Sequence, residues 1–197
     1  MFKIYFDIET NNLKGTSIIQ IAAISQNHTY FNGFCTLKCN LSFKCTELTG
    51  FYTHGNILFL NGKQVVTQQE NIVLRNFVDW IEIQSPEPIY LIAHNSFNFD
   101  ARILLNHCSA LGIKLSNRVN FIDTLPLIKK LYTGLIANFQ LKTIAEFFKI
   151  PNTLSHTALS DAIALKQIID IIIDQQKLRT TFIENFSRTL SSFETKK

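Results

Sequence analysis

The chain begins with a stretch in which every second residue is apolar, and this alternation constrains the fold more than any other local pattern. The apolar positions are Phe2, Ile4, Phe6 and Ile8. Successive side chains of a β-strand point to opposite faces, so a period of two is typical of a strand with one face in a core. We therefore predict a strand over residues 2–9, with Asp7 and Glu9 together on its other face.

Apolar runs after this strand predict a sheet that begins with three antiparallel strands. Residues 18–24 and 29–37 have the composition of a second and a third strand, and the short connections favour an antiparallel meander. Further along, helical and strand-like patterns alternate. Helices are expected at 68–83, 97–111, 124–132 and 141–148 and from residue 158, and strands at 89–93 and 119–122. This order predicts an α/β domain whose central mixed β-sheet is flanked by helices.

The composition indicates one domain. The chain has 197 residues, 46% of them hydrophobic, which is enough for one substantial core. No stretch rich in Pro, Gly or Ser marks a linker. Residues 39–66 are the least regular and are expected to hold an insertion or a loop over the site. Residues 176–197 are expected to form a C-terminal helical extension of the same domain with a frayed end.

Cysteine spacing, charge and the ends of the chain bear on location and partners. The four cysteines lack paired C-x-x-C spacing, so we expect free thiols, with a zinc site or a disulfide as the alternative. The N-terminus lacks the features of a secretory signal, and residues 168–174 are too short to cross a bilayer. We expect an intracellular, cytoplasmic protein without a membrane segment. The net charge of +4 is compatible with a polyanionic partner but does not require one.

Three clusters of polar residues could carry chemistry. Asp7 and Glu9 are expected on one strand face, with about 6 to 7 Å between their Cα atoms. Asp100 opens a helix after a strand, where α/β domains place functional groups. His156 precedes Asp161, which falls in the first turn of the last long helix. Each cluster has an ordinary alternative, because exposed acids on a sheet face and acids at helix N-termini are common.

Taken in order, the clusters resemble three motifs of a known family. They are a strand-borne D-x-E, an H-N-x-x-x-F-D after a later strand, and an H-x-x-x-x-D at the last long helix. This set is similar to the DEDDh branch of 3′–5′ exonucleases in the ribonuclease H-like superfamily, which includes the proofreading epsilon subunit of polymerases and ribonuclease T. The likeness covers roughly residues 2–175, so residues 1–175 are expected to form the exonuclease domain.

The resemblance implies a site with two magnesium ions, for which manganese should substitute. Asp7, Glu9, Asp100 and Asp161 would hold the ions, with Asp7 bridging both, and His156 would act as general base. Four converging carboxylates need counter-charge, and hard divalent cations prefer oxygen ligands. Two ions about 3.5 to 4 Å apart can activate a water molecule and stabilise the leaving 3′-oxygen.

The resemblance also implies contacts with the terminal nucleotide. Thr10 and Leu13 match positions that contact it, and Asn95 and Phe99 are the further substrate-binding candidates. A turn residue and a core Phe are the respective alternatives for Asn95 and Phe99. Asn11 and Asn12 replace the Thr-Gly of many relatives, so the turn that positions Leu13 is expected to be tighter or looser here.

The sequence therefore predicts a two-metal-ion 3′–5′ exonuclease that releases nucleoside monophosphates from single-stranded or frayed 3′ ends of DNA or RNA. One alternative is a nucleic-acid-binding or partner-docking protein with little catalysis on the same fold. Another is a different metal-dependent phosphoesterase on a related fold. Nucleic-acid 3′ ends are the expected partner, while a polymerase or a second copy of the chain stays open. No residue pattern separates DNA from RNA, because that choice depends on how the pocket treats the 2′-hydroxyl.

Overall fold

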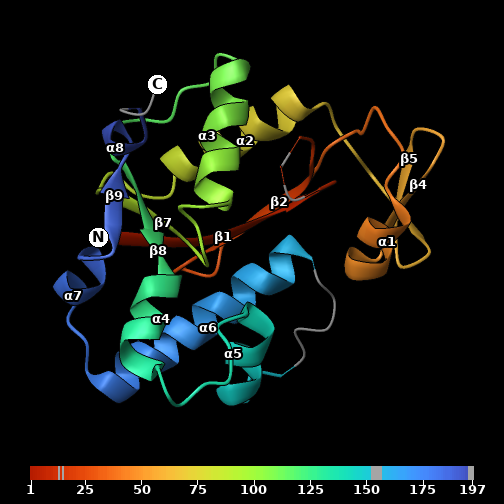
Figure 1. Cartoon of the computed structure of the whole chain (residues 1–197). Coiled ribbons are helices and arrows are strands. Elements are labelled where there is room, and N and C mark those ends of the chain that lie inside the picture. Colours follow the sequence, from red (N-terminus) through yellow and green to blue (C-terminus); the bar gives the residue numbers. More distant parts are fainter. Residues whose placement is uncertain (13, 15, 152–156, 195–197) are drawn as a thin grey trace.

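The computed structural model describes every residue of the chain except 13, 15, 152–156 and 195–197. A six-stranded sheet in the order β3-β2-β1-β7-β8-β9 forms its centre (Figure 1). The first three strands are antiparallel to one another, β7 and β8 continue the sheet in parallel with β1, and β9 is antiparallel to β8. The predicted mixed sheet with three leading antiparallel strands is confirmed. The strands are β1 Phe2–Thr10, β2 Ile18–Ser25, β3 Tyr30–Phe34, β7 Ile89–Ala93, β8 Val119–Asp123 and β9 Ser187–Thr189.

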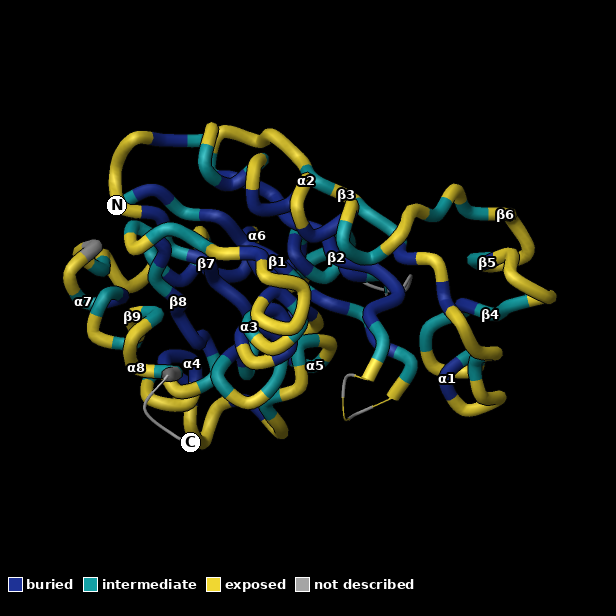
Figure 2. The backbone as a smooth tube through the Cα atoms, turned by 90° about the horizontal axis from the view of Figure 1, so that it is seen from above, coloured by how far each residue is buried: buried dark blue, intermediate teal, exposed yellow. Residues whose placement is uncertain are grey.

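Helices cover both faces of this sheet (Figure 1). One face carries α2 and α3, and the other carries α4, α5 and α6. In Figure 2 the inner strands β1, β2, β7 and β8 run as mostly buried segments, while the helices have exposed outer surfaces. None of the helices in the described part of the chain is long and apolar enough to cross a membrane. The helix bounds are α2 Glu70–Glu82, α3 Asp100–Ala110, α4 Thr124–Tyr132, α5 Leu141–Phe147 and α6 Ala158–Gln176.

The two faces of β1 belong to two different cores. Ile4, Phe6 and Ile8 lie in the core beneath α2 and α3, as the alternation predicts. Tyr5 points the other way and is fully buried in the core beneath α4, α5 and α6. The second face of the strand is therefore covered as well, and its polar residues near the C-terminal end lie against α6. This covering brings Asp7 and Glu9 next to a helix.

Residues 43–65 form a small insertion lobe at one end of the sheet (Figure 1). The lobe consists of α1 Phe43–Thr49 and a three-stranded antiparallel sheet, β4 Phe51–His54, β5 Ile57–Leu60 and β6 Lys63–Val65. Its own small core contains Cys45, Phe51 and Leu58 and packs against Ile19 of β2. Helix α1 ends at Gly50, whose φ of 73° favours glycine. The insertion expected in residues 39–66 is present and carries regular structure.

The segment after α6 contains two short helices and a strand. They are α7 Thr180–Glu184, β9 and α8 Ser191–Glu194. The sequence patterns did not predict β9, because it has three residues and two of them are exposed. Phe193 of α8 packs edge-on against Phe97 and Phe121, with ring centroids 5.8 Å and 5.5 Å away. This segment thus closes the sheet edge beside the loop that leads into α3.

Candidate metal centre

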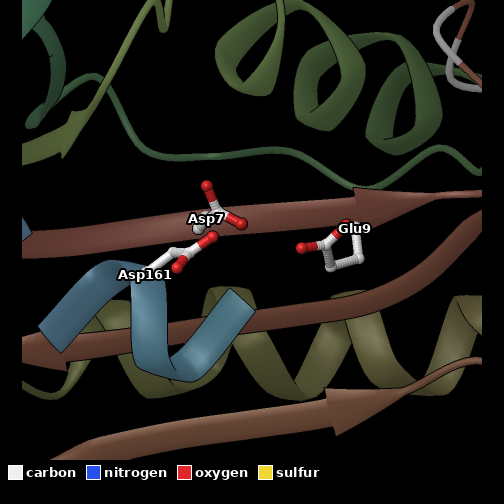
Figure 3. Close-up of side chains that lie close together, drawn as sticks. All are labelled: Asp7, Glu9 and Asp161. Carbon is white, nitrogen blue, oxygen red and sulfur yellow. The ribbon is translucent and has the colours of Figure 1, made fainter. Parts of the chain in front are cut away.

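Three carboxylates from two elements meet at the C-terminal end of β1 (Figure 3). Asp7 and Glu9 come from β1, and Asp161 comes from α6. One ligand oxygen from each lies within 4.8 Å of the others, and all three side chains are partly buried. Asp7 and Asp161 point toward each other in Figure 3, with Glu9 beside them. The structure therefore brings together three of the four acids predicted to hold metal.

The fourth acid, Asp100, reaches the same strand from the start of α3. It is the first residue of α3 and is 2% exposed. Its Oδ1 accepts a hydrogen bond of 3.0 Å from the backbone N–H of Ile8, the residue between Asp7 and Glu9. Asp100 is therefore adjacent to the three-carboxylate group but outside the set whose oxygens lie within 4.8 Å of one another.

The start of α6 is fixed by a buried glutamine. Gln20 of β2 is 1% exposed, and its Oε1 accepts a 2.9 Å hydrogen bond from the backbone N–H of Ala158. Its Nε2 donates a 2.8 Å bond to Asn32 of β3. Gln20 is also the register partner of Glu9 across β1 and β2. Gln20 thus links β2, which pairs with the strand that carries Asp7 and Glu9, to the first turn of the helix that carries Asp161.

A capping box completes this helix start. The side chain of Thr157 accepts a hydrogen bond from the backbone N–H of Ser160, and the Ser160 hydroxyl accepts one from the backbone N–H of Thr157. Reciprocal bonds of this kind satisfy two of the donors that a helix N-terminus leaves free. Asp161 follows directly at the end of the first turn.

The carboxylates disturb one another's protonation. Burial raises the pKa of Asp7 well above its ordinary value, and the charges of Asp100, Glu9 and Asp161 raise it further. Burial, with the charges of Asp161 and Asp100, raises the pKa of Glu9 to about 8. Burial likewise raises the pKa of Asp100 to about 7, against the lowering effect of its backbone hydrogen bonds. All four acids therefore share one electrostatic site.

This donor set fits a hard divalent cation. All the ligand atoms are carboxylate oxygens, which Mg²⁺ and Mn²⁺ prefer. No described Lys, Arg or His forms an ion pair with Asp7, Glu9 or Asp100. Desolvated carboxylates that repel one another are stabilised by a cation placed between them. Such an ion could be held by Asp7, Glu9 and Asp161, whose oxygens lie close together. Asp100 lies next to this group and could add a further ligand.

A cavity of about 780 Å³ adjoins Glu9. Glu9 and Thr10 line one side, Lys44, Cys45 and Leu48 of α1 line another, and Phe99 contributes an aromatic ring. Thr10 is buried, and its hydroxyl donates a 2.7 Å hydrogen bond to the Asn12 carbonyl. The insertion lobe thus supplies one wall of the cavity. An insertion or a loop over the site was expected in residues 39–66, but none of the lobe's lining residues was predicted.

The remaining candidates differ in their placement. Asn95 has a φ of 59°, and its side-chain oxygen accepts a 2.8 Å hydrogen bond from Asn98, so it serves the turn before α3. Phe99 is partly buried against the core beneath α3 and still lines the cavity. His156, the predicted base, and Leu13, the predicted contact to the terminal base, lie outside the described residues.

Two residues that sequence reasoning did not assign hold the loop before Asp100. Asp123 accepts hydrogen bonds from the backbone N–H groups of Phe97, at 3.1 Å, and Leu125, at 2.9 Å. His94 is hydrogen-bonded through its two ring nitrogens to Thr124 Oγ1 and the Phe139 carbonyl. Burial lowers the pKa of His94, so the neutral ring acts as a structural link. Polar residues at the ends of two parallel strands were the available sequence signal.

Comparison with known proteins identifies the family of this chain. The family model described as Exonuclease matches residues 4–169. The chain belongs to this exonuclease family. The resemblance to DEDDh-type exonucleases of the ribonuclease H-like superfamily is thereby confirmed.

One curated relative and two solved structures show the range of the likeness. The chain is 30% identical over 171 residues to a DNA polymerase III PolC-type from Caldanaerobacter subterraneus subsp. tengcongensis, covering 84% of this chain and 11% of the polymerase. Two E. coli exonuclease I structures, a zinc-bound complex with single-stranded DNA and a complex with a dA16 oligonucleotide, superpose with TM-scores of 0.72. They share 14% and 12% identity, and each match covers 89% of this chain and 41% of the other. The chain therefore spans a small part of the polymerase and less than half of exonuclease I, and the structural likeness shows the fold.

Proposed function

We propose that the chain is a metal-dependent 3′–5′ exonuclease that hydrolyses the terminal phosphodiester of a nucleic-acid strand. The observation that carries the proposal is the convergence of three carboxylates, Asp7, Glu9 and Asp161, one of which, Glu9, lines a cavity of about 780 Å³. That volume lies in the range of about 300 to 1,000 Å³ usual for ligand sites. Membership of the exonuclease family supports the same reaction.

The carboxylates would hold two Mg²⁺ ions, for which Mn²⁺ should substitute. When bound, such ions lower the pKa of a water molecule and stabilise the charge on the leaving 3′-oxygen. Asp7 and Asp161 face each other and are the residues placed to share an ion, while Glu9 and Asp100 would complete the ligand set. The raised pKa values of Asp7, Glu9 and Asp100 mean that metal binding must displace protons from this cluster.

The chain's own residues would bind the terminal nucleotide in the large cavity. Thr10 lies directly after Glu9 and lines the cavity, while Leu48 and Phe99 supply apolar surface on which a base can rest. Stacking of a base on an aromatic side chain contributes about 1 to 3 kcal/mol. His156, five residues before Asp161, is the proposed base that removes a proton from the attacking water.

The products would be nucleoside monophosphates released from single-stranded or frayed 3′ ends of DNA or RNA. A closed duplex cannot place one terminal base in the cavity without separating it from its partner. The PolC-type relative is a polymerase, and a polymerase partner for this chain, or a second copy of it, remains a prediction. Copurification or size-exclusion chromatography would test either partner.

Digestion of a labelled strand tests the proposal. The substrate is a single strand with a fluorophore at its 5′ end, so that loss from the 3′ end produces a ladder of shortened labelled products. We expect this ladder with Mg²⁺ or Mn²⁺ and none with EDTA. Matched DNA and RNA strands, single and duplex, run in parallel to define the substrate. Binding without shortening in every metal tested would refute the enzyme and favour the nucleic-acid-binding alternative.

A further inference from the structure

A second, smaller cavity lies beside the proposed nucleotide site. Its volume is about 260 Å³, and it is lined by Lys14, Asn98, Phe99, Arg102, Ile103 and Asn106. Lys14 and Phe99 also line the larger cavity, so the two cavities are adjacent. Glu9, one of the proposed metal ligands, lines the larger cavity and not the smaller one. The smaller cavity therefore adjoins the proposed nucleotide site, and none of the proposed metal ligands lines it.

The smaller cavity is lined by hydrogen-bond donors and cations. Lys14 and Arg102 carry positive charges, and Asn98 and Asn106 add side-chain amides. One amide hydrogen of Asn98 is used in the bond to Asn95, which leaves the second for a ligand. No acidic side chain is among the residues that line this cavity. The chemistry of the lining matches an anion with several acceptor oxygens.

The two cations are not neutralised by the described protein. Neither Lys14 nor Arg102 forms an ion pair with an acid in the part of the chain that the structure describes. The backbone of Lys14 is held by a 2.9 Å hydrogen bond from its N–H to Asn12 Oδ1, and Asn12 in turn donates a 2.7 Å bond to Thr16. Arg102 lies in the first turn of α3, two residues after Asp100. Both charges are thus attached to segments that also shape the metal centre.

We propose that this cavity binds the internucleotide phosphates immediately upstream of the terminal nucleotide, an inference that rests on the proposed function. With the terminal nucleotide between Glu9 and Phe99, the strand continues past Phe99 to Lys14 and Arg102. Phosphate contacts position a strand and carry no sequence information. The site therefore favours substrates longer than one nucleotide, whatever their sequence. Lys44, on the wall formed by the insertion lobe, marks the other direction in which a strand could leave.

Equilibrium binding tests the proposal independently of catalysis. The probe is a fluorescently labelled single strand with phosphorothioate linkages at its 3′ end, titrated with the protein in Ca²⁺ at several salt concentrations, and read by fluorescence anisotropy. The test variant is Lys14→Ala/Arg102→Ala. The matched control is Arg75→Ala/Lys142→Ala, which removes two exposed cations that line neither cavity. For a single strand, each phosphate contact that is lost reduces the slope of log affinity against log salt concentration by about 0.7.

We expect the test variant to bind the strand more weakly and to reduce the salt slope by about 1.4, the value for two phosphate contacts. The control should keep the parent's affinity and slope. In Mg²⁺, the test variant should lose more kcat/KM on an oligonucleotide than on a p-nitrophenyl ester of a nucleoside 5′-monophosphate, which has no upstream phosphate.

Three outcomes would overturn the proposal. The first is a double variant with the parent's salt slope. The second is an equal loss of kcat/KM on the ester and on the oligonucleotide. The third is a loss of affinity and salt slope in Lys44→Ala that is absent from the double variant. A parent protein that binds the strand with the expected slope but never cleaves it would refute the proposed exonuclease while leaving this phosphate site standing. A parent protein that cleaves the strand, together with a double variant that binds it as the parent does, would refute the phosphate site and leave the proposed exonuclease standing.

Discussion

The strand half and the helix half of the metal centre are positioned by different kinds of interaction. Asp7 and Glu9 lie on β1, whose backbone pairs with β2 opposite Ala22 and Gln20. Asp161 lies on α6, whose start depends on side-chain bonds to Thr157, Ser160 and Gln20. A ladder of backbone bonds fixes the first pair, whereas a few side-chain bonds fix the third acid. The helix half should therefore be the more sensitive to conservative substitutions away from the acids themselves.

The largest effect is expected from Asp7→Asn, on the strand half. Removing one ligand charge should lower kcat at least about 100-fold, since even outer-shell partners of a metal commonly matter 10- to 100-fold. The same change should raise the melting temperature at pH 8 in EDTA, because it relieves repulsion from Glu9, Asp100 and Asp161. Labelled-strand digestion and calorimetry measure the two effects.

The control for this experiment is Asp174→Asn, which removes an exposed charge from the far end of α6. It should leave both activity and the EDTA melting temperature near the parent's. Parental activity in Asp7→Asn would show that the cluster is not the catalytic centre.

On the helix half, Gln20→Leu should reduce activity without touching an acid. The leucine leaves the buried N–H of Ala158 without its acceptor, which costs about 1 to 3 kcal/mol of folding free energy. The start of α6 is then free to shift, and a displacement of about 1 Å in a catalytic group can lower the rate about 100-fold. We expect kcat to fall about 10- to 100-fold at a temperature well below unfolding, with weaker Mg²⁺ binding.

Two variants separate positioning from general destabilisation. Ile81→Val shortens a fully buried side chain of α2 and costs about 0.5 to 1.5 kcal/mol, with no route to the acids. Asn32→Ala removes the partner of Gln20 on β3 but keeps the bond to α6. Both should retain near-parental kcat. If Ile81→Val lowered kcat as far as Gln20→Leu, the glutamine would have no specific positioning role.

The same comparison explains how much the sequence could reveal. The period-two pattern predicts β1 and the shared face of Asp7 and Glu9, because strand geometry is local. The place of Asp161 in the first turn of the last long helix is likewise predicted from a local stretch of sequence. The bond between Gln20 and Ala158 joins residues 138 positions apart. A polar residue within an apolar run does not reveal which distant residue it will bond to. The packing of the helices on the second face of β1, which buries Tyr5, is equally non-local.

The short strands β9, β4, β5 and β6 were not predicted from the sequence, for a related reason. Strand β9 has three residues, and its existence depends on an unpaired edge of β8 rather than on its own apolar pattern. The strands of the insertion lobe have three or four residues each and are separated by turns. Segments this short carry too few residues for a period to be distinguished. The cavity wall formed by α1 was therefore foreseen as an insertion, without Lys44 or Leu48 as site residues.

In the absence of metal, the pH dependence of stability should report the burial and mutual repulsion of the carboxylates around β1. The pKa of Glu9 is raised to about 8 and that of Asp100 to about 7, so between pH 5 and these values the folded state binds more protons than the unfolded state. Stability in EDTA should therefore fall as pH rises from 5.5 to 8.5. Saturating Mg²⁺ should remove most of this slope, because it binds the ionised form.

Melting temperatures at a series of pH values, with EDTA or with Mg²⁺, measure this effect. Asp7→Asn should flatten the EDTA curve, because it removes one of the interacting charges. An EDTA curve that rises with pH over this interval would contradict the assignment of raised pKa values to the cluster.

The smallest effect is expected from Ser160→Ala, which removes half of the capping box on α6. Thr157 still caps the helix less completely, and Gln20 still holds the N–H of Ala158. Loss of a cap costs about 0.5 to 2 kcal/mol, and a chain of this size loses about 2 to 4 °C per kcal/mol. We expect a lower melting temperature by a few degrees in thermal unfolding and a change in kcat of less than about threefold, equivalent to under 1 kcal/mol. A loss of kcat as large as that of Gln20→Leu would mean that the capping box, rather than the glutamine, positions Asp161.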